Sequence, residues 1–96
     1  MESSAPLTPE VDLHRLGLRF ADARLLDPRA IAALARSIEQ SGQLIACIAV
    51  PEAHSNRLIL VDGYQRVLAL RQLGRDTARV ETWACDLAQA LLMVLA

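Results

Sequence analysis

The stretch from Leu58 to Leu70 constrains the fold most, because its hydrophobic period changes at a single Asp-Gly pair. Residues 58–61 form a short apolar run, which is typical of a buried strand. Beyond Asp62 and Gly63, apolar residues recur at helical spacing until Gly74, and glycine commonly ends helices. The stretch therefore predicts a strand, a tight turn and a helix.

The turn in this stretch is suited to an anion. Glycine lacks a Cβ, so the backbone at Gly63 can approach a ligand closely. The first helical turn offers unpaired N–H groups and the positive end of the helix dipole, and Arg66 adds a planar guanidinium. We therefore predict a phosphate-sized site from Gly63 to Arg66. An ordinary Asp-Gly junction with a solvated arginine is the alternative, because the turn matches neither of the well-known glycine-rich phosphate loops.

A helix and a strand are expected before this stretch. Asp27 is a good N-cap, Pro28 suits the first helical position and Gly42 suits the end, with apolar residues at helical spacing between them. The run Leu44–Val50 is short, apolar and followed by Pro, which favours a buried strand. The loop of residues 51–57 has a length typical of an antiparallel hairpin with the strand that follows.

Three weaker patterns complete the chain. Residues 11–18 alternate in part, which indicates a first strand, and residues 78–85 alternate throughout, which predicts a last strand. Asp86 is placed to cap an apolar helix after it. The element order is then (β)-α-β-β-α-β-α. We expect an α+β fold, with a small mixed β-sheet and helices packed on it.

The length of 96 residues fits one domain. Residues 1–10 are rich in Ser, Pro and Glu, so we expect a disordered tail there and the folded domain over residues 11–96. Apolar residues make up 53% of the chain, and the last helical pattern stops without an end signal. We therefore expect the domain to be truncated at its C-terminal end, within a longer parent protein.

Charge and cysteine content exclude several classes of protein. The net charge is -1, so there is no electrostatic case for nucleic-acid binding by this segment alone. All ten basic residues are arginine, which excludes chemistry that needs a Schiff-base or P-loop lysine. Two cysteines make no disulfide framework, and Cys47 is expected to be a small buried side chain. No signal-peptide core or membrane-length apolar run is present, so we expect a cytoplasmic protein without membrane contact.

The predicted turn and its surroundings resemble the ParB/sulfiredoxin superfamily. The ParB turn reads Gly-Glu-Arg-Arg-x-Arg-Ala and the sulfiredoxin turn reads Gly-Cys-His-Arg, and here Gly63, Arg66 and Ala69 match. Ser37, Ile38 and Gly42 also match the end of a ParB helix, Ser-Ile-x-x-x-Gly. The resemblance covers nearly the whole chain after the tail. It implies a ParB/sulfiredoxin-like fold and a nucleotide whose phosphates rest on the Gly-x-x-Arg turn, CTP in ParB and ATP in sulfiredoxin.

The resemblance also implies site residues and partners. The implied nucleotide-binding residues are Gly63, Tyr64, Gln65 and Arg66 at the turn and Ser41, Gly42 and Gln43 on the other side. Asp62 is a candidate ligand for Mg²⁺, with a purely turn-forming role as the alternative. The implied function is a CTP-type regulatory domain of a DNA-associated, partition-like protein. Such a protein is expected to form a homodimer and to contact DNA through downstream domains of the parent.

Departures from the family pattern leave two alternatives open. Tyr64 stands where sulfiredoxin has its cysteine, which excludes reductase chemistry at this position. Tyr64 and Gln65 replace the Glu-Arg of ParB, and Leu68 replaces its second downstream arginine. With Asp62 as the only carboxylate beside the turn, we expect no turnover by this chain, and a phosphotransferase, nuclease or full-length CTPase is one alternative. A dimerisation module with a decayed nucleotide site is the other.

Overall fold

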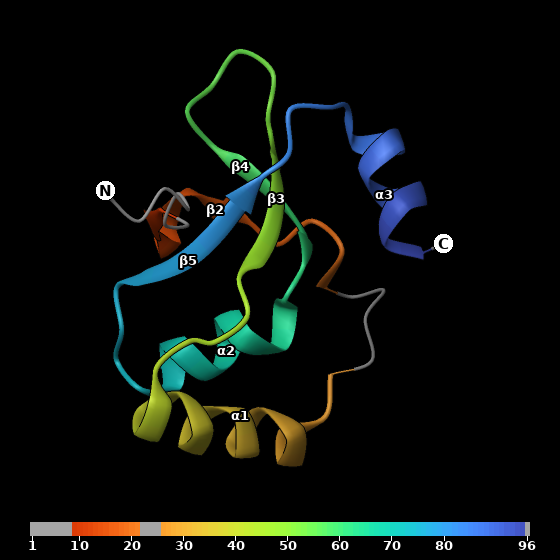
Figure 1. Ribbon diagram of the computed structural model, residues 1–96. Coiled ribbons are helices and arrows are strands. Elements are labelled where there is room, and N and C mark those ends of the chain that lie inside the picture. The colour runs from red at the N-terminus through yellow and green to blue at the C-terminus, as the bar shows by residue number, and fades with distance from the viewer. Residues whose placement is uncertain (1–8, 22–25, 96) are drawn as a thin grey trace, which may run out of the picture.

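The computed structural model describes residues 9–21 and 26–95 (Figure 1). The elements in this part of the chain are β1 (Glu10–Asp12), the 3-10 turn η1 (Leu13–Arg15), β2 (Leu16–Gly17), α1 (Pro28–Ser41), β3 (Cys47–Pro51), β4 (Leu58–Asp62), α2 (Tyr64–Gln72), β5 (Thr77–Thr82) and α3 (Leu87–Leu95). The predicted tail lies almost entirely outside the described residues, although Glu10 already belongs to β1. The expected α+β architecture is confirmed.

The described strands form one mixed sheet in the order β1-β5-β3-β4-β2. β3 pairs with β4 as the predicted antiparallel hairpin, whereas β3 with β5 and β4 with β2 are parallel pairs. β1 adds to β5 in the antiparallel sense. The centre of the sheet is therefore the hairpin whose second strand leads into the predicted turn.

The sheet is curled because β1 and β2 lie at its opposite edges although only η1 separates them in the chain. In a flat five-stranded sheet the edge strands would be roughly 19 Å apart, at about 4.8 Å per strand. The four peptide units between Asp12 and Leu16 span at most about 14 Å. The short connection therefore requires the two edges to approach each other.

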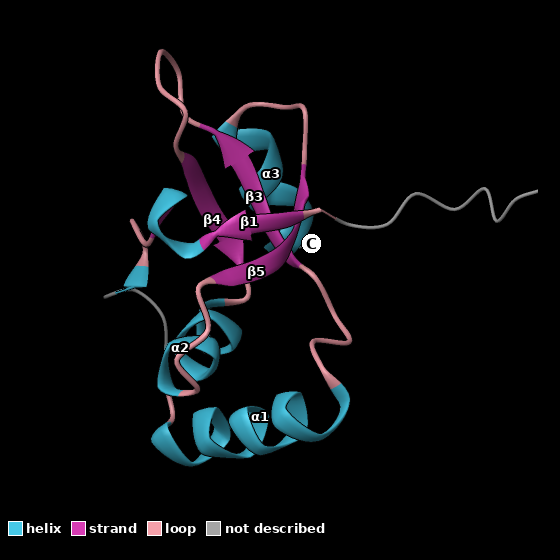
Figure 2. Cartoon of the chain, turned by 90° about the vertical axis from the view of Figure 1, so that its left-hand side faces the viewer, coloured by secondary structure: helices cyan, strands magenta, loops and turns pink. Residues whose placement is uncertain are grey.

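Helices cover both faces of the sheet (Figures 1 and 2). Leu58 and Leu60 of β4 belong to the larger core cluster, which includes the buried stripes of α1 and α2. Ile59 and Val61 point the other way and pack with Ala90 of α3. This alternation explains why β4 is a continuous apolar run. No helix in the described ranges is long and apolar enough to cross a membrane.

Helix α1 has the predicted ends. The Asp27 carboxylate accepts a hydrogen bond from the N–H of Arg29 at 2.9 Å, and Pro28 occupies the first turn. At the other end Gly42 adopts φ 76° and donates its N–H to the carbonyl of Ile38 at 2.7 Å. These local signals set the two ends of the helix.

Three strand predictions differ from the structure at their ends. The expected first strand over residues 11–18 is interrupted by η1, because the Asp12 carboxylate accepts a hydrogen bond from the N–H of His14 at 2.8 Å and turns the chain. The strand expected at residues 44–50 begins only at Cys47, and Leu44 and Ile45 are 70% and 61% exposed. The strand expected over residues 78–85 ends at Thr82, after which the chain bends toward α3.

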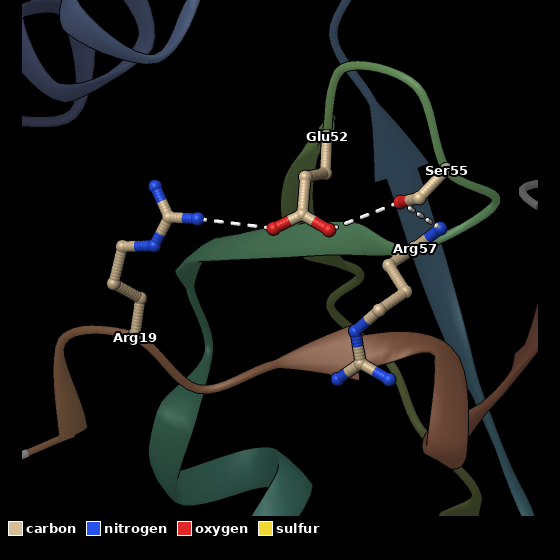
Figure 3. Close-up of polar contacts among 4 residues, drawn as sticks. All are labelled: Arg19, Glu52, Ser55 and Arg57. Carbon is tan, nitrogen blue, oxygen red and sulfur yellow. Dashed lines mark hydrogen bonds and ion pairs between the residues drawn. The ribbon is translucent and has the colours of Figure 1, made fainter.

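The loop between β3 and β4 is held by a chain of polar contacts (Figure 3). The Glu52 carboxylate pairs with Arg19 at 3.1 Å and accepts a hydrogen bond from the hydroxyl of Ser55 at 3.0 Å. The same hydroxyl oxygen accepts the N–H of Arg57 at 3.1 Å. The loop is thereby fastened to the segment that follows β2.

Candidate functional site

Gly63 connects β4 to α2 in a conformation that other residues rarely adopt, with φ 105°. A Cβ at this position would lie 2.8 Å from the Sγ of Cys47 and 3.1 Å from its Cα. From the sequence, Gly63 was expected to allow the close approach of a ligand. The structure shows that β3 itself makes the close approach, so this glycine is required by the fold whether or not a ligand binds.

A pocket of about 260 Å³ opens at the beginning of α2. Its lining residues come from the turn and from the neighbourhood of α1: Leu26, Leu34, Asp62, Gly63, Tyr64, Gln65 and Arg66. The first hydrogen bond of helix α2 runs from the N–H of Val67 to the carbonyl of Gly63, at 3.0 Å. The N–H groups of Gln65 and Arg66 therefore have no acceptor within the helix, and the positive end of the helix dipole faces the pocket.

Arg66 supplies the positive side chain of this pocket. It is half-buried and forms no ion pair with any described residue. Arg66 is also close enough to Cys47 to affect the pKa of that thiol. Burial raises the pKa of Cys47 to about 11, while the positive charge of Arg66 lowers it and the negative charge of Asp62 raises it. A half-buried guanidinium without a carboxylate partner beside a helix N-terminus is the arrangement that binds an oxyanion.

The side chains of Tyr64 and Gln65 serve the fold. The buried Tyr64 hydroxyl donates to the carbonyl of Leu60 at 2.9 Å and accepts the N–H of Phe20 at 3.0 Å. The Oε1 of Gln65 accepts the N–H of Asp27 at 3.0 Å. These two predicted site residues therefore line the pocket at the turn while their side chains attach α2 to the start of α1 and to the segment after β2.

Of the second group of predicted site residues, Ser41, Gly42 and Gln43, only the last two line a pocket beside Arg66. Gly42 and Gln43 line a smaller pocket of about 130 Å³ that Arg66 also lines, so Arg66 lies between the two pockets. Ser41 is exposed at the end of α1 and lines neither pocket. The Gln43 amide is already engaged, because it donates to the carbonyl of Arg79 at 2.9 Å and accepts the N–H of the same residue at 2.7 Å.

Asp62 is the one carboxylate among the described residues that line the larger pocket. Among the described residues no group of three or more acidic, His or Cys side chains is placed to hold a metal ion. Mg²⁺ is commonly held by one or two carboxylates together with water and substrate phosphates. The residues present therefore fit only a magnesium ion that a bound phosphate chain largely ligates.

Sequence reasoning missed the apolar wall of the smaller pocket. Leu34 and Ile38 contribute from α1, and Leu44 and Ile45 contribute from the segment before β3. Leu44 and Ile45 were assigned to a buried strand, and their position two and three residues after the helix-ending Gly42 was the available signal that they form a connecting segment.

The fold is similar to that of solved ParB and sulfiredoxin structures. No family model and no curated protein matches the sequence, but solved structures match over most of the chain. The chromosome-partitioning protein ParB from Caulobacter crescentus, solved with CTP-γ-S, superimposes with a TM-score of 0.77 at 20% identity over 88% of this chain and 48% of that chain. Sulfiredoxin from Arabidopsis thaliana gives 0.77 at 21% identity over 95% and 99% of the two chains.

A third similar structure is an enzyme. A free serine kinase in complex with AMP superimposes with a TM-score of 0.68 at 18% identity, over 80% of this chain and 31% of that chain. At such low identities the likeness establishes the fold and leaves the activity open. The chain spans about half the length of the ParB structure and nearly all of sulfiredoxin.

Proposed function

We propose that this chain is a ParB-like nucleotide-binding regulatory domain of a cytoplasmic, DNA-associated, partition-like protein. The observation that carries the proposal is the guanidinium of Arg66, which has no carboxylate partner among the described residues and lies beside the N-terminus of α2, in a pocket that opens on the Gly63 turn. The fold supports it, since the ParB and serine kinase structures with this fold are complexes with a CTP analogue and with AMP. The ligand is a CTP-type nucleotide with Mg²⁺.

The phosphates and the nucleoside of the ligand bind in different pockets. The phosphates lie in the larger pocket, where the N–H groups of Gln65 and Arg66 and the Arg66 guanidinium bind their oxygens. The nucleoside binds in the smaller pocket, on the other side of Arg66 from the phosphates. The apolar wall of this pocket includes Leu44 and Ile45 and suits a planar base. Asp62 completes the ligands of a magnesium ion held by the phosphates.

The regulatory role follows from what the pocket lacks. Asp62 is the only carboxylate that lines the larger pocket in the described structure, so no separate base is positioned to activate a nucleophile. Binding without turnover therefore suits this chain, with homodimerisation and DNA contacts supplied in the assembled parent protein. A dimerisation module with a decayed site is the second candidate, favoured by the exposure of Leu92 and Met93 on α3, at 71% and 60%.

Calorimetric titration with CTP, ATP and GTP in Mg²⁺ tests the proposal. Arg66→Ala should weaken nucleotide binding about tenfold or more, because it removes a charge-assisted contact worth about 1.5–3 kcal/mol. Arg36→Ala is the matched control, since Arg36 is exposed on α1 and lines neither pocket. Asp62→Asn should reduce the dependence of binding on Mg²⁺.

Three outcomes decide between the candidates. Equal affinity of Arg66→Ala and the unmodified chain would refute the assigned site. A chain that ignores every nucleotide but dimerises with increasing concentration in sedimentation would favour the decayed module. Release of phosphate from CTP or ATP, reduced in Asp62→Asn, would establish an enzyme instead.

A further inference from the structure

Two arginines form a second basic site at the opposite end of β4 from Gly63. Arg15 directly precedes β2 and Arg57 directly precedes β4, and these strands pair in parallel with Leu16 opposite Leu58. The five residues of β4 separate Arg57 from Gly63, a distance of roughly 20 Å at about 3.3 Å per residue. This pair of arginines is therefore separate from the pockets around Arg66.

Each of the two side chains binds the backbone next to the other arginine. The Nε of Arg15 donates to the carbonyl of Asn56 at 2.8 Å, and the Nη1 of Arg57 donates to the carbonyl of His14 at 3.2 Å. These reciprocal bonds orient both guanidinium groups before any ligand arrives. A guanidinium carries five N–H donors, so each keeps most of its donors for a further partner.

The charges of this pair are not compensated within the described structure. Neither arginine forms an ion pair there, and the Glu52 carboxylate of the same hairpin is paired with Arg19. Figure 3 shows the Arg57 guanidinium directed away from Glu52 and toward the segment that contains β2. Like charges at neighbouring strand positions repel each other, and a bound anion would remove that cost.

The geometry points to a phosphate-binding site between the guanidinium groups of Arg15 and Arg57. The planar fork of arginine matches the oxygens of a phosphate group, and two such forks match a doubly charged one. Arg57 is exposed and Arg15 is half-buried, so the donors are accessible to solvent. The ligand is a phosphate group, supplied either as a small anion or as the backbone of a nucleic acid, where such contacts are independent of sequence.

Nuclear magnetic resonance on the isotope-labelled chain tests this site. The arginine Nε–H signals are followed during titration with inorganic phosphate at constant ionic strength, and separately with a short single-stranded DNA. We expect saturable shifts at Arg15 and Arg57, and an affinity about tenfold or more weaker in Arg57→Gln. Arg36→Gln removes the same charge from an exposed position on α1 and should bind like the unmodified chain.

The outcomes identify the source of the phosphate or overturn the site. Saturation by inorganic phosphate assigns a small anion, and saturation by the DNA alone assigns a nucleic-acid backbone. Shifts that never saturate, unchanged affinity in Arg57→Gln, or equal weakening in Arg36→Gln would overturn the proposal. Arg66→Ala leaves this pair intact, so the titration is independent of the nucleotide site proposed above.

Discussion

Replacing Gly63 by alanine tests how the turn is built. The new Cβ would lie 2.8 Å from the Sγ, 3.0 Å from the Cβ and 3.1 Å from the Cα of Cys47, and the residue would keep φ 105°. The left-handed conformation costs about 1–2 kcal/mol, and overpacking against a buried neighbour costs about 1–3 kcal/mol. Gly63→Ala should therefore destabilise the chain by about 2–5 kcal/mol, out of roughly 5–14 kcal/mol expected for 96 residues.

Urea unfolding measures this loss. With a slope of about 1 kcal/mol/M, the midpoint of Gly63→Ala should fall by about 2 M or more. Gly74→Ala is the matched control, because Gly74 has φ 74° but nothing within 4 Å of an added Cβ. It should lose only about 1–2 kcal/mol, the cost of the conformation.

A double-mutant cycle isolates the contact with Cys47. Removing Sγ in Cys47→Ala should reduce the additional cost of Gly63→Ala by about 1 kcal/mol. The relief is incomplete because the Cβ and Cα of residue 47 stay within 3.1 Å of the added methyl group. A Gly63→Ala protein no less stable than Gly74→Ala, or strictly additive effects in the cycle, would refute this account of the turn.

Two further predictions concern buried groups. Tyr64→Phe should cost about 1–3 kcal/mol in urea unfolding, because the carbonyl of Leu60 and the N–H of Phe20 both lose their partner; an unchanged midpoint would contradict this. Burial raises the pKa of Cys47 from 9.0 to about 11, so the folded state holds the proton more tightly than the unfolded state. The contribution of this thiol to stability is therefore intact below pH 9 and falls between pH 9 and 11, by roughly 3 kcal/mol, and Cys47→Ala should lack this part of the loss.

The sequence predicted elements whose signals are local. The bounds of α1 follow from Asp27, Pro28 and Gly42, which act on their immediate neighbours, and the junction at Gly63 follows from a change of period within a few residues. The hairpin followed from the length of one loop. In each case the deciding interactions lie within about one turn of helix or one loop, so they are visible in the order of residues.

The sequence did not predict features that depend on distant partners. Cys47 rather than Leu44 begins β3 because the Gln43 amide is bound to Arg79, 36 positions away, and to the carbonyl of Ile45. The buried hydroxyl of Tyr64 accepts a hydrogen bond from the N–H of Phe20, 44 positions away. Such contacts leave no periodic signal in the sequence. The position of the turn was therefore predictable, but the contacts made by its side chains were not.

The short connection between β1 and β2 has a consequence for aggregation. Edge strands expose unpaired backbone groups that can recruit another chain, and here one segment of eight residues, Glu10–Gly17, supplies both edges of the sheet. Losing that segment would uncover β5 on one side and β4 on the other at the same time. Proteolytic removal of these residues would therefore replace two short edge strands by the longer strands β5 and β4, each of which could then pair with another chain.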